Sequence, residues 1–333
     1  MPEVLRINPR VALIRLPLPL EGLTSVNCYV LTGDNETVVV DPGWTSPETD
    51  RDLRFGLETL GIDVRDISRI LTTHHHWDHY TQAITWQRAH GIPVHLGKGE
   101  DASIHAWSTL DGAFPRQVVL LERAGAPKLA SAIAAIPVEP HERAMDFELP
   151  AGWIGDGEEF DLGGLIVRAL ATPGHTRGHV CFELVGEDML LTGDHVLPRI
   201  TPSVAYEREP DPRSLASYLG SLRLVADLPD SRMLPAHGDH GGSSAGRARE
   251  LLDHHDLRLA TIRDLVATGH DTAGEIAAAM TWTRHDRRLG DLERIHQMTA
   301  VLEVAAHLSV LTRDGAVRAS AADGVNRYAL ISS

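Results

Sequence analysis

Cysteine, aromatic residues and basic residues are all scarce in this chain of 333 residues. Only Cys28 and Cys181 are present, and two thiols cannot staple a fold of this size. We therefore expect both thiols to be buried and the protein to work in the reducing cytoplasm. Lys and Arg number 31 against 46 Asp and Glu, so the formal net charge is −15. An acidic surface repels phosphate backbones and argues against nucleic acid as the main partner.

Long apolar segments are absent as well. No run of about 18 apolar residues occurs, so we expect no membrane span. The apolar stretch near the N-terminus is broken by Arg15, Pro17 and Pro19, which does not predict a secretory signal. Hydrophobic residues still make up 43% of the chain, enough for a sizeable core. The length suits one large domain followed by a small one.

Histidine is abundant by contrast, with 19 residues against 5 Phe and 5 Tyr. The densest group lies in Thr72–His79, which reads TTHHHWDH. A strand leading into a tight loop places alternate side chains on one side, so His74 and His76 can meet at one ion. Asp78 and His79 follow where the chain turns into a helix, and they can serve a second ion. Imidazole and carboxylate suit zinc, and also iron or manganese.

Three further residues of the metal-binding type stand apart from this segment. His175, Asp194 and His237 each follow a predicted strand and lie beside a Gly or Pro turn. Catalytic groups are commonly mounted on loops that a rigid scaffold positions in this way. A single histidine after a strand is more often structural, but three such positions beside the first group favour a metal centre.

Short β-rich runs and helices alternate twice within the first 240 residues. Strands are predicted at Val11–Leu16, Asn27–Leu31, Thr37–Val40, Ile67–Thr73, Leu165–Leu170, His179–Val185, Met189–Leu191 and Met233–Leu234. Helices are predicted over residues 46–61, 81–90 and 211–226, the last with Asp211 as its cap and Pro212 in its first position. Residues 99–150 are less regular and indicate a partly helical insertion or lid. Two β-rich halves with outer helices predict a four-layer αββα sandwich.

The composition becomes helical beyond residues 241–244. Helices are predicted at 272–280 and 291–308. A hairpin is predicted from Val310–Leu311 and Val317 around a turn at 313–315, with a third strand at Tyr328–Ile331. Helices followed by a hairpin are the outline of a winged helix. The sequence thus predicts a catalytic domain over residues 1–245 and a smaller winged-helix-like domain over residues 246–333.

Taken together, the motifs resemble the metallo-β-lactamase superfamily from about residue 10 to residue 240. The resemblance implies a hydrolase with two divalent metal ions per chain, zinc first, with iron or manganese as alternatives. It also implies a ligand set, in which Asp194 bridges the two ions. The first ion would be bound by His74, His76 and His175, and the second by Asp78, His79 and His237.

Several other residues are expected to support this centre or to contact the substrate. Asp41, in Val-Val-Val-Asp-Pro-Gly, resembles the family aspartate that supports the ligand loop without binding metal. His179 and His195 are not family ligands and are expected next to the ligands or in the pocket. Candidate pocket residues in the loop after Asp194 are Arg199, Thr201, Ser203 and Tyr206.

The expected mechanism follows from charge. Two dications about 3.5–4 Å apart lower the pKa of a shared water to near 7 and polarise the substrate oxygen. Asp78 is expected to orient the attacking water, and Asp194 to help move its proton.

Details of the motifs limit the classes of substrate that the chain is expected to hydrolyse. The run TTHHHWDH resembles glyoxalase II, but Tyr80-Thr81-Gln82 stands where that enzyme has Ala-Gly-Gly. A dedicated β-lactamase is disfavoured, because the common subclass carries cysteine where Asp194 stands. The tail resembles the appendage of the lactamase-beta-2-like branch, which includes acyl-thioesterase relatives and endoribonucleases.

A thioester or ester hydrolase acting on a small acyl-CoA-like or acyl-carrier-like substrate is our first hypothesis. A thiolate with a pKa near 8.5 leaves readily, so little acid catalysis is needed. A metal-dependent endoribonuclease and a lactonase are the alternatives, and a metabolite-sensing regulator is the non-enzymatic one. From His254 onward nine Arg face ten Asp or Glu, without the basic stripe usual in nucleic-acid readers. The tail is expected to line the substrate entrance or to mediate homodimerisation.

Overall fold

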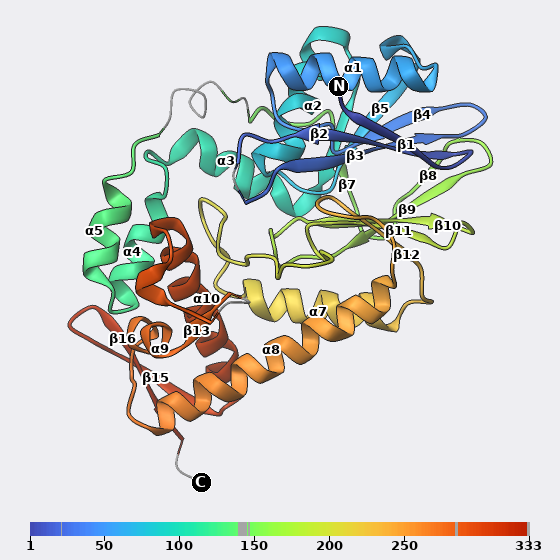
Figure 1. Ribbon diagram of the computed structural model, residues 1–333. Coiled ribbons are helices and arrows are strands. Elements are labelled where there is room, and N and C mark those ends of the chain that lie inside the picture. The colour runs from blue at the N-terminus through green and yellow to red at the C-terminus, as the bar shows by residue number, and fades with distance from the viewer. Residues whose placement is uncertain (21, 139–144, 146, 284–285, 332–333) are drawn as a thin grey trace.

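Two β-sheets stacked face to face form the centre of the molecule. The structure is a computed structural model, and it describes residues 1–20, 22–138, 145, 147–283 and 286–331. The first sheet has the order β1 to β7, and the second has the order β12-β11-β10-β9-β8. Figure 1 shows α1 and α2 over the outer face of the first sheet, and α7 and α8 over the outer face of the second. The predicted four-layer αββα sandwich is confirmed.

The first sheet is an antiparallel meander from β1 to β4 that continues with parallel strands to β7. Its strands are β1 (Glu3–Asn8), β2 (Val11–Pro17), β3 (Ser25–Thr32), β4 (Thr37–Val40), β5 (Ile67–Thr72), β6 (Val94–Gly97) and β7 (Gly152–Ile154). The second sheet is antiparallel except where β11 meets β12. Its strands are β8 (Glu159–Asp161), β9 (Ile166–Ala171), β10 (Val180–Val185), β11 (Met189–Gly193) and β12 (Arg232–Pro235).

Alternation along the strands divides the buried side chains among three layers, because successive residues of a strand point to opposite faces. In β2, Leu13 lies in the core between the sheets, and Ile14 packs under the outer helices of the first sheet. In β10, Phe182 belongs to the same central core, whereas Cys181 faces the helices of the second sheet. Cys28 is fully buried too, so both thiols are free and buried as expected.

Helices α1 (Pro47–Leu60) and α2 (Trp77–His90) cover the first sheet, and α7 (Ser214–Asp227) and α8 (Ser244–Ala267) cover the second. The start of α1 agrees with its predicted cap, because the Ser46 hydroxyl accepts a hydrogen bond from the Thr49 amide at 3.0 Å. Gly61 ends the helix in the left-handed conformation at φ 79°. Two other predicted starts were wrong. Helix α2 begins at Trp77 rather than residue 81, and α7 begins at Ser214 rather than at Pro212.

The insertion and the tail share one hydrophobic core. The insertion forms α3 (Asp101–Thr109), α4 (Pro115–Arg123) and α5 (Pro127–Ala134). Leu121 and Ile133 of the insertion belong to the same buried cluster as Ile262 of α8 and Met298 of the tail. Figure 1 shows α4 and α5 beside the tail helices at one end of the sandwich. The boundary at 245/246 stays a prediction; it falls in the first turn of α8.

The tail itself contains α9 (Ala273–Ala279), the short strands β13 (Thr281–Trp282) and β14 (Arg287–Arg288), α10 (Arg294–Arg313) and a hairpin of β15 (Val317–Ala322) and β16 (Val325–Leu330). The assignment of Val310–Leu311 to a strand was wrong. Both side chains are buried against the tail and α7 as part of α10, so tertiary packing outweighs their strand preference. The hairpin turn is Asp323-Gly324, with positive φ at both residues, as a type I′ turn requires. No helix among the described residues is long and apolar enough to cross a membrane.

Candidate metal centre

The functional side chains gather where strands of both sheets end at the same edge of the sandwich. Strand β5 runs directly into the loop that carries His74 and His76, and α2 starts in that loop. Strands β9, β11 and β12 run in one direction, because β9 and β11 are both antiparallel to β10 and β12 is parallel to β11. Their carboxyl ends are followed by His175, Asp194 and His237 in turn. The fold therefore brings together residues that are up to 163 positions apart, from His74 to His237.

Three histidines form the first group of this cluster. The Nδ1 atom of His76 lies 3.0 Å from Nε2 of His74 and 3.0 Å from Nε2 of His175. Both His74 and His175 are buried. Their three nitrogen atoms thus face one another across a distance at which they could share one ion.

The second group contains a carboxylate. The Oδ2 atom of Asp78 lies 3.5 Å from Nε2 of His79 and 3.3 Å from Nε2 of His237. Asp194 stands between the two groups. Its Oδ1 lies 3.3 Å from Nε2 of His237, and its Oδ2 lies 3.5 Å from Nε2 of His175.

Hydrogen bonds outside the cluster fix which nitrogen of three histidines faces inward. The Nδ1 of His79 donates to a carboxylate oxygen of Asp41 at 3.0 Å, because that oxygen can only accept. The Nδ1 atoms of His175 and His237 donate to backbone carbonyls at 2.7 and 2.8 Å. In its neutral form, each of these imidazoles therefore carries on Nε2 a lone pair that points into the cluster.

Inward lone pairs and buried carboxylates are the donor set that a divalent cation needs. Three buried atoms, Nε2 of His79, Nε2 of His237 and Oδ1 of Asp194, make no hydrogen bond within the part of the chain that the structure describes. Lone pairs that face each other repel, and a buried carboxylate needs a compensating cation. Burial and neighbouring histidines hold the pKa of His74 and His76 well below the usual range, which favours the neutral form that coordinates metal. The residues therefore fit divalent metal ions of the zinc, iron or manganese type.

Asp41 accepts hydrogen bonds from the segment that carries the proposed metal ligands His74, His76 and His79. Its carboxylate accepts hydrogen bonds from the Thr73 amide and hydroxyl, both at 2.8 Å, as well as from His79. Its backbone has a positive φ of 52°, which is rare for a residue with a side chain and is maintained only where the surroundings enforce it. Asp41 thus orients His79 without facing the centre of the cluster.

Comparison with known proteins places this arrangement in a family. A sequence profile of the metallo-beta-lactamase superfamily matches residues 22–237. The chain belongs to this superfamily. The matched span contains every member of the two groups and Asp194, and the buried histidine and aspartate clusters are consistent with a metal site typical of the superfamily. The assignment of individual residues as ligands stays a prediction.

Two solved members of the superfamily are similar over nearly the whole chain, tail included. A metallo-beta-lactamase family protein from Thermus thermophilus is 27% identical with a TM-score of 0.76, covering 98% of this chain and 100% of that one. A beta-lactamase domain protein from Burkholderia ambifaria is 26% identical with a TM-score of 0.74, covering 99% of this chain and 95% of that one. The tail is therefore part of an arrangement that other members share.

Curated relatives are fungal lactamase-like proteins. One from Pestalotiopsis microspora is 28% identical over 239 residues, which cover 72% of this chain and 57% of the relative. The lactamase-like protein adaB from Aspergillus niger is 34% identical over 139 residues, which cover 42% of this chain and 39% of the relative. The matched regions thus span between about two-fifths and three-fifths of the length of these relatives.

The two histidines expected beside the ligands of this superfamily member lie behind the cluster. The Nδ1 of His179 is 2.8 Å from the Thr172 hydroxyl, and its Nε2 accepts from the Asp194 amide at 3.2 Å. His195 is fully buried, and its ring centre lies 5.0 Å from that of Tyr218 in α7. Neither histidine faces solvent. The structure therefore places both behind the cluster, buried away from solvent.

The four candidate pocket residues separate into two pairs. The Ser203 carbonyl accepts the hydrogen bond from His175 at 2.7 Å, and the Tyr206 ring lies 6.1 Å from the His76 ring. Arg199 points elsewhere, because it is exposed and pairs with Asp239 at 3.1 Å. Thr201 is half-buried, and no contact within the described part of the chain connects it with the cluster. Ser203 and Tyr206 thus remain candidates for the pocket.

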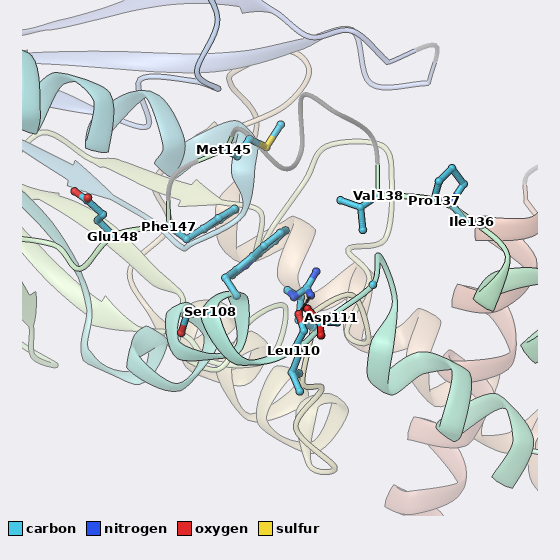
Figure 2. A pocket seen from close by; sticks show the side chains of 12 residues that line it. Ser108, Leu110, Asp111, Ile136, Pro137, Val138, Met145, Phe147 and Glu148 are labelled. Atoms are coloured by element: carbon cyan, nitrogen blue, oxygen red, sulfur yellow. Dashed lines mark hydrogen bonds between the residues drawn. The ribbon is translucent and has the colours of Figure 1, made fainter.

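A cavity of about 680 Å³ lies beside the insertion. Figure 2 shows Leu110, Val138, Met145 and Phe147 among the residues that line it. Other lining residues are Trp107, whose ring stacks on Phe147 at 3.8 Å, and Arg208, whose guanidinium lies 4.5 Å from the Trp107 ring centre. The wall of the cavity is therefore mixed, because aromatic and aliphatic side chains lie beside the charged residues Asp111, Glu148 and Arg208.

A buried cluster of polar residues next to the metal centre had no counterpart among our predictions. Its acidic members are Glu100 and Glu207, and the histidine is His75, which lies between two ligand candidates. The Nδ1 of His75 donates to Glu100 at 2.8 Å, and the Ser103 hydroxyl donates to Glu207 at 2.7 Å. No motif marks either glutamate, because their partners lie 25 and 104 positions away in the sequence.

Proposed function

We propose that this superfamily member is a binuclear metal-dependent hydrolase that cleaves a thioester or ester of a small acyl donor, such as an acyl-CoA or an acyl carrier. The observation that carries the proposal is the position of Asp194, with one carboxylate oxygen towards each of the two groups of metal-binding side chains. The proposed ligands are His74, His76 and His175 for one ion, and Asp78, His79 and His237 for the other. Zinc is the first candidate metal.

When bound, the two ions would supply Lewis acidity and lower the pKa of a water to near 7. The residues of the protein fix the orientation of the proposed metal ligands. Asp41 and the two backbone carbonyls hold the imidazoles of His79, His175 and His237 in fixed orientations. Asp78 would orient the attacking water, and Asp194 would help to move its proton. Such preorganised groups act where charge develops in the transition state.

The residues around the cluster favour a substrate whose leaving group does not need a general acid. A thiolate leaves with a pKa near 8.5 and needs no strong general acid. His179 and His195 are the histidines behind the cluster, and both are fully buried, so they cannot reach a leaving group on the solvent side. A substrate with a poor leaving group would need an acid that these two residues do not provide.

The neighbouring cavity supports an apolar acyl group. Tyr206 lies near His76, and Arg208 follows two residues later, so their Cα atoms are at most about 7 Å apart. Arg208 lines the cavity beside the insertion, so the segment whose Tyr206 lies near His76 continues into the wall of this cavity. We propose that its apolar residues, Trp107 and Phe147 among them, contact the acyl group, and that Arg208 contacts a polar part of the substrate.

The tail presents few side chains that could bind RNA. Helix α10, the element expected to read nucleic acid in a winged helix, is the core of the tail, with Met298, Val304 and Leu308 fully buried. Two arginines that could contact phosphates are paired with acidic residues of the same chain, Arg258 with Glu303 and Arg327 with Asp271. We propose that the tail instead supports the insertion that lines the substrate cavity.

A paired measurement tests the proposal. The metal-loaded protein is assayed for thiol release from acyl-CoA substrates, and for RNA binding by anisotropy between about 50 and 300 mM salt. We expect thiol release that chelator abolishes, and RNA binding too weak to show the steep salt dependence of phosphate contacts. Metal-dependent RNA cleavage without thiol release would reverse the ranking, and hydrolysis of lactones alone would favour the lactonase.

A further inference from the structure

Glu100 lies where two loops of the proposed metal centre meet. It ends the short helix η2 (Lys98–Glu100) and is fully buried. One carboxylate oxygen accepts from Nδ1 of His75 at 2.8 Å, and the other accepts from the hydroxyl of Thr176. His75 lies between the proposed ligands His74 and His76, and Thr176 directly follows the proposed ligand His175. A single carboxylate therefore holds both segments that carry the first group.

Glycines bring the backbones close enough for this contact. A Cβ at Gly178 would lie 2.2 Å from the Glu100 amide nitrogen, and a Cβ at Gly97 would lie 1.9 Å from the Gly178 carbonyl oxygen. Both distances are far inside van der Waals contact, so side chains at these positions would push the His175 loop away from η2. The loop is thus packed directly against the backbone that carries Glu100.

Glu207 completes the cluster but contacts different atoms. Its carboxylate accepts from Ser103 at 2.7 Å and from Nε of Arg177 at 3.2 Å. No hydrogen bond joins Glu207 to His75 or Thr176 among the described residues. Within the same described ranges, the second group makes no hydrogen bond with either glutamate. Its histidines His79 and His237 are held by Asp41 and the Ser25 carbonyl instead.

We propose that Glu100 is a positioning residue that fixes the separation of His74, His76 and His175, and so sets the affinity of the first metal site independently of the second. The inference depends on the proposed function, because it requires both metal sites. The physical reason is that a ligand's neighbours decide how little the ligand must reorganise when the ion binds. Removing the shared carboxylate frees two loops that carry the first group and leaves the supports of the second unchanged.

The test compares metal binding by the full-length chain and its Glu100→Ala variant. Cobalt is titrated into metal-free protein, and the two sites are followed by visible absorption and by the kinetics of release to a chelator. We expect the Kd of the first site to rise by about 10- to 100-fold, the range usual for residues that orient ligands, while the second site keeps its affinity. Asp52→Ala is the control, because this buried carboxylate of α1 accepts from Arg51 and contacts neither group, and it should leave the two affinities in their wild-type ratio.

Two further variants keep the test decisive where Glu100→Ala does not fold. Thr176→Val and His75→Gln each remove one of the two contacts of Glu100, and either should weaken the first site selectively. Equal weakening of both sites, or no change in either, would overturn the inference while leaving the proposed function intact. A wild-type chain that binds no metal would instead overturn the proposed function, and this inference with it.

Discussion

Two buried clusters of histidines in this protein have different chemistry. The metal-centre cluster points lone pairs and the carboxylates of Asp78 and Asp194 into one space. The second cluster joins α8 to α10, where Nδ1 of His307 donates to the Glu303 carbonyl at 2.7 Å, and its Nε2 therefore accepts from Nδ1 of His255 at 3.1 Å. Most of the ring nitrogens of this pair are hydrogen-bonded, and no carboxylate of the described residues lies between the two rings. Histidine density alone therefore does not mark a metal site; inward lone pairs with buried carboxylates do.

The largest effect that would distinguish the clusters is expected from Asp194→Ala. Loss of the carboxylate between the two groups removes a negative charge that both ions share, so metal content should fall from two equivalents to one or fewer. Hydrolysis should fall by about 10³-fold, equivalent to about 4 kcal/mol of transition-state stabilisation. Elemental analysis and steady-state kinetics measure the two effects. Asp161→Ala, an exposed carboxylate in β8, serves as control, and near-native turnover in Asp194→Ala would show that the chemistry lies elsewhere.

Removal of metal by a chelator should lower the stability of the folded chain through the metal-centre cluster and not through the cluster of His255 and His307. An ion that binds only the folded chain adds about 4 kcal/mol when its free concentration is about 1,000 times its Kd. We expect thermal unfolding of the metal-loaded protein to shift to a lower temperature after chelation, and to recover on reloading with zinc. His307→Gln should leave the size of this shift unchanged, because His307 lies in the other cluster. A melting temperature that does not respond to metal would contradict the proposed centre.

The smallest effect is expected from mild acid on the tail pair. Burial lowers the pKa of His255 to about 3 and that of His307 to about 4, below the ordinary value of 6.5. For bases whose pKa is lowered by folding, the contribution to stability is complete above about pH 6.5 and is lost as the pH falls from about 6.5 towards 4. Each such histidine costs up to about 1.4 kcal/mol per pH unit in that window. Groups facing the pair are Tyr218 of α7, His254 and Arg258 of α8, and Glu303 of α10.

Denaturant unfolding at about pH 7.5, 6.5 and 5.5 would measure this loss across the ordinary pKa of histidine. The comparison is between the wild-type chain and His307→Gln, both stripped of metal, because the metal-centre histidines also take up protons in acid. Glutamine keeps an acceptor for His255 but does not titrate. The unfolding free energy of the His307→Gln chain should therefore depend less on pH than that of the wild-type chain. Parallel pH profiles for the two chains would contradict the assigned role of the pair.

Helices and strands could be predicted from the sequence where the residues that determine them all lie within the same segment. The strand Thr37–Val40 and the capped helix ending at Gly61 agree with the structure because their signals lie within a few residues. The approach of His175, Asp194 and His237 to the His74 segment came from the resemblance to a family, since no local pattern places strand ends together. Glu100 was missed because its role depends on partners in distant loops. The strand assigned to Val310–Leu311 failed because the core of the tail, which local preference does not record, makes it helical.

The core that the insertion shares with the tail has a consequence for synthesis of the chain. Helix α5 ends at Ala134, and α10 begins at Arg294, which is 160 positions later. At about 5–20 residues per second, a ribosome needs about 8–32 s to make that stretch. During this time the apolar faces of α4 and α5 lack the α10 side chains that complete their core, since Met298 and its neighbours do not yet exist. The nascent chain should therefore be most prone to aggregate, and most dependent on chaperones, after the sandwich strands have emerged and before α10 leaves the ribosome.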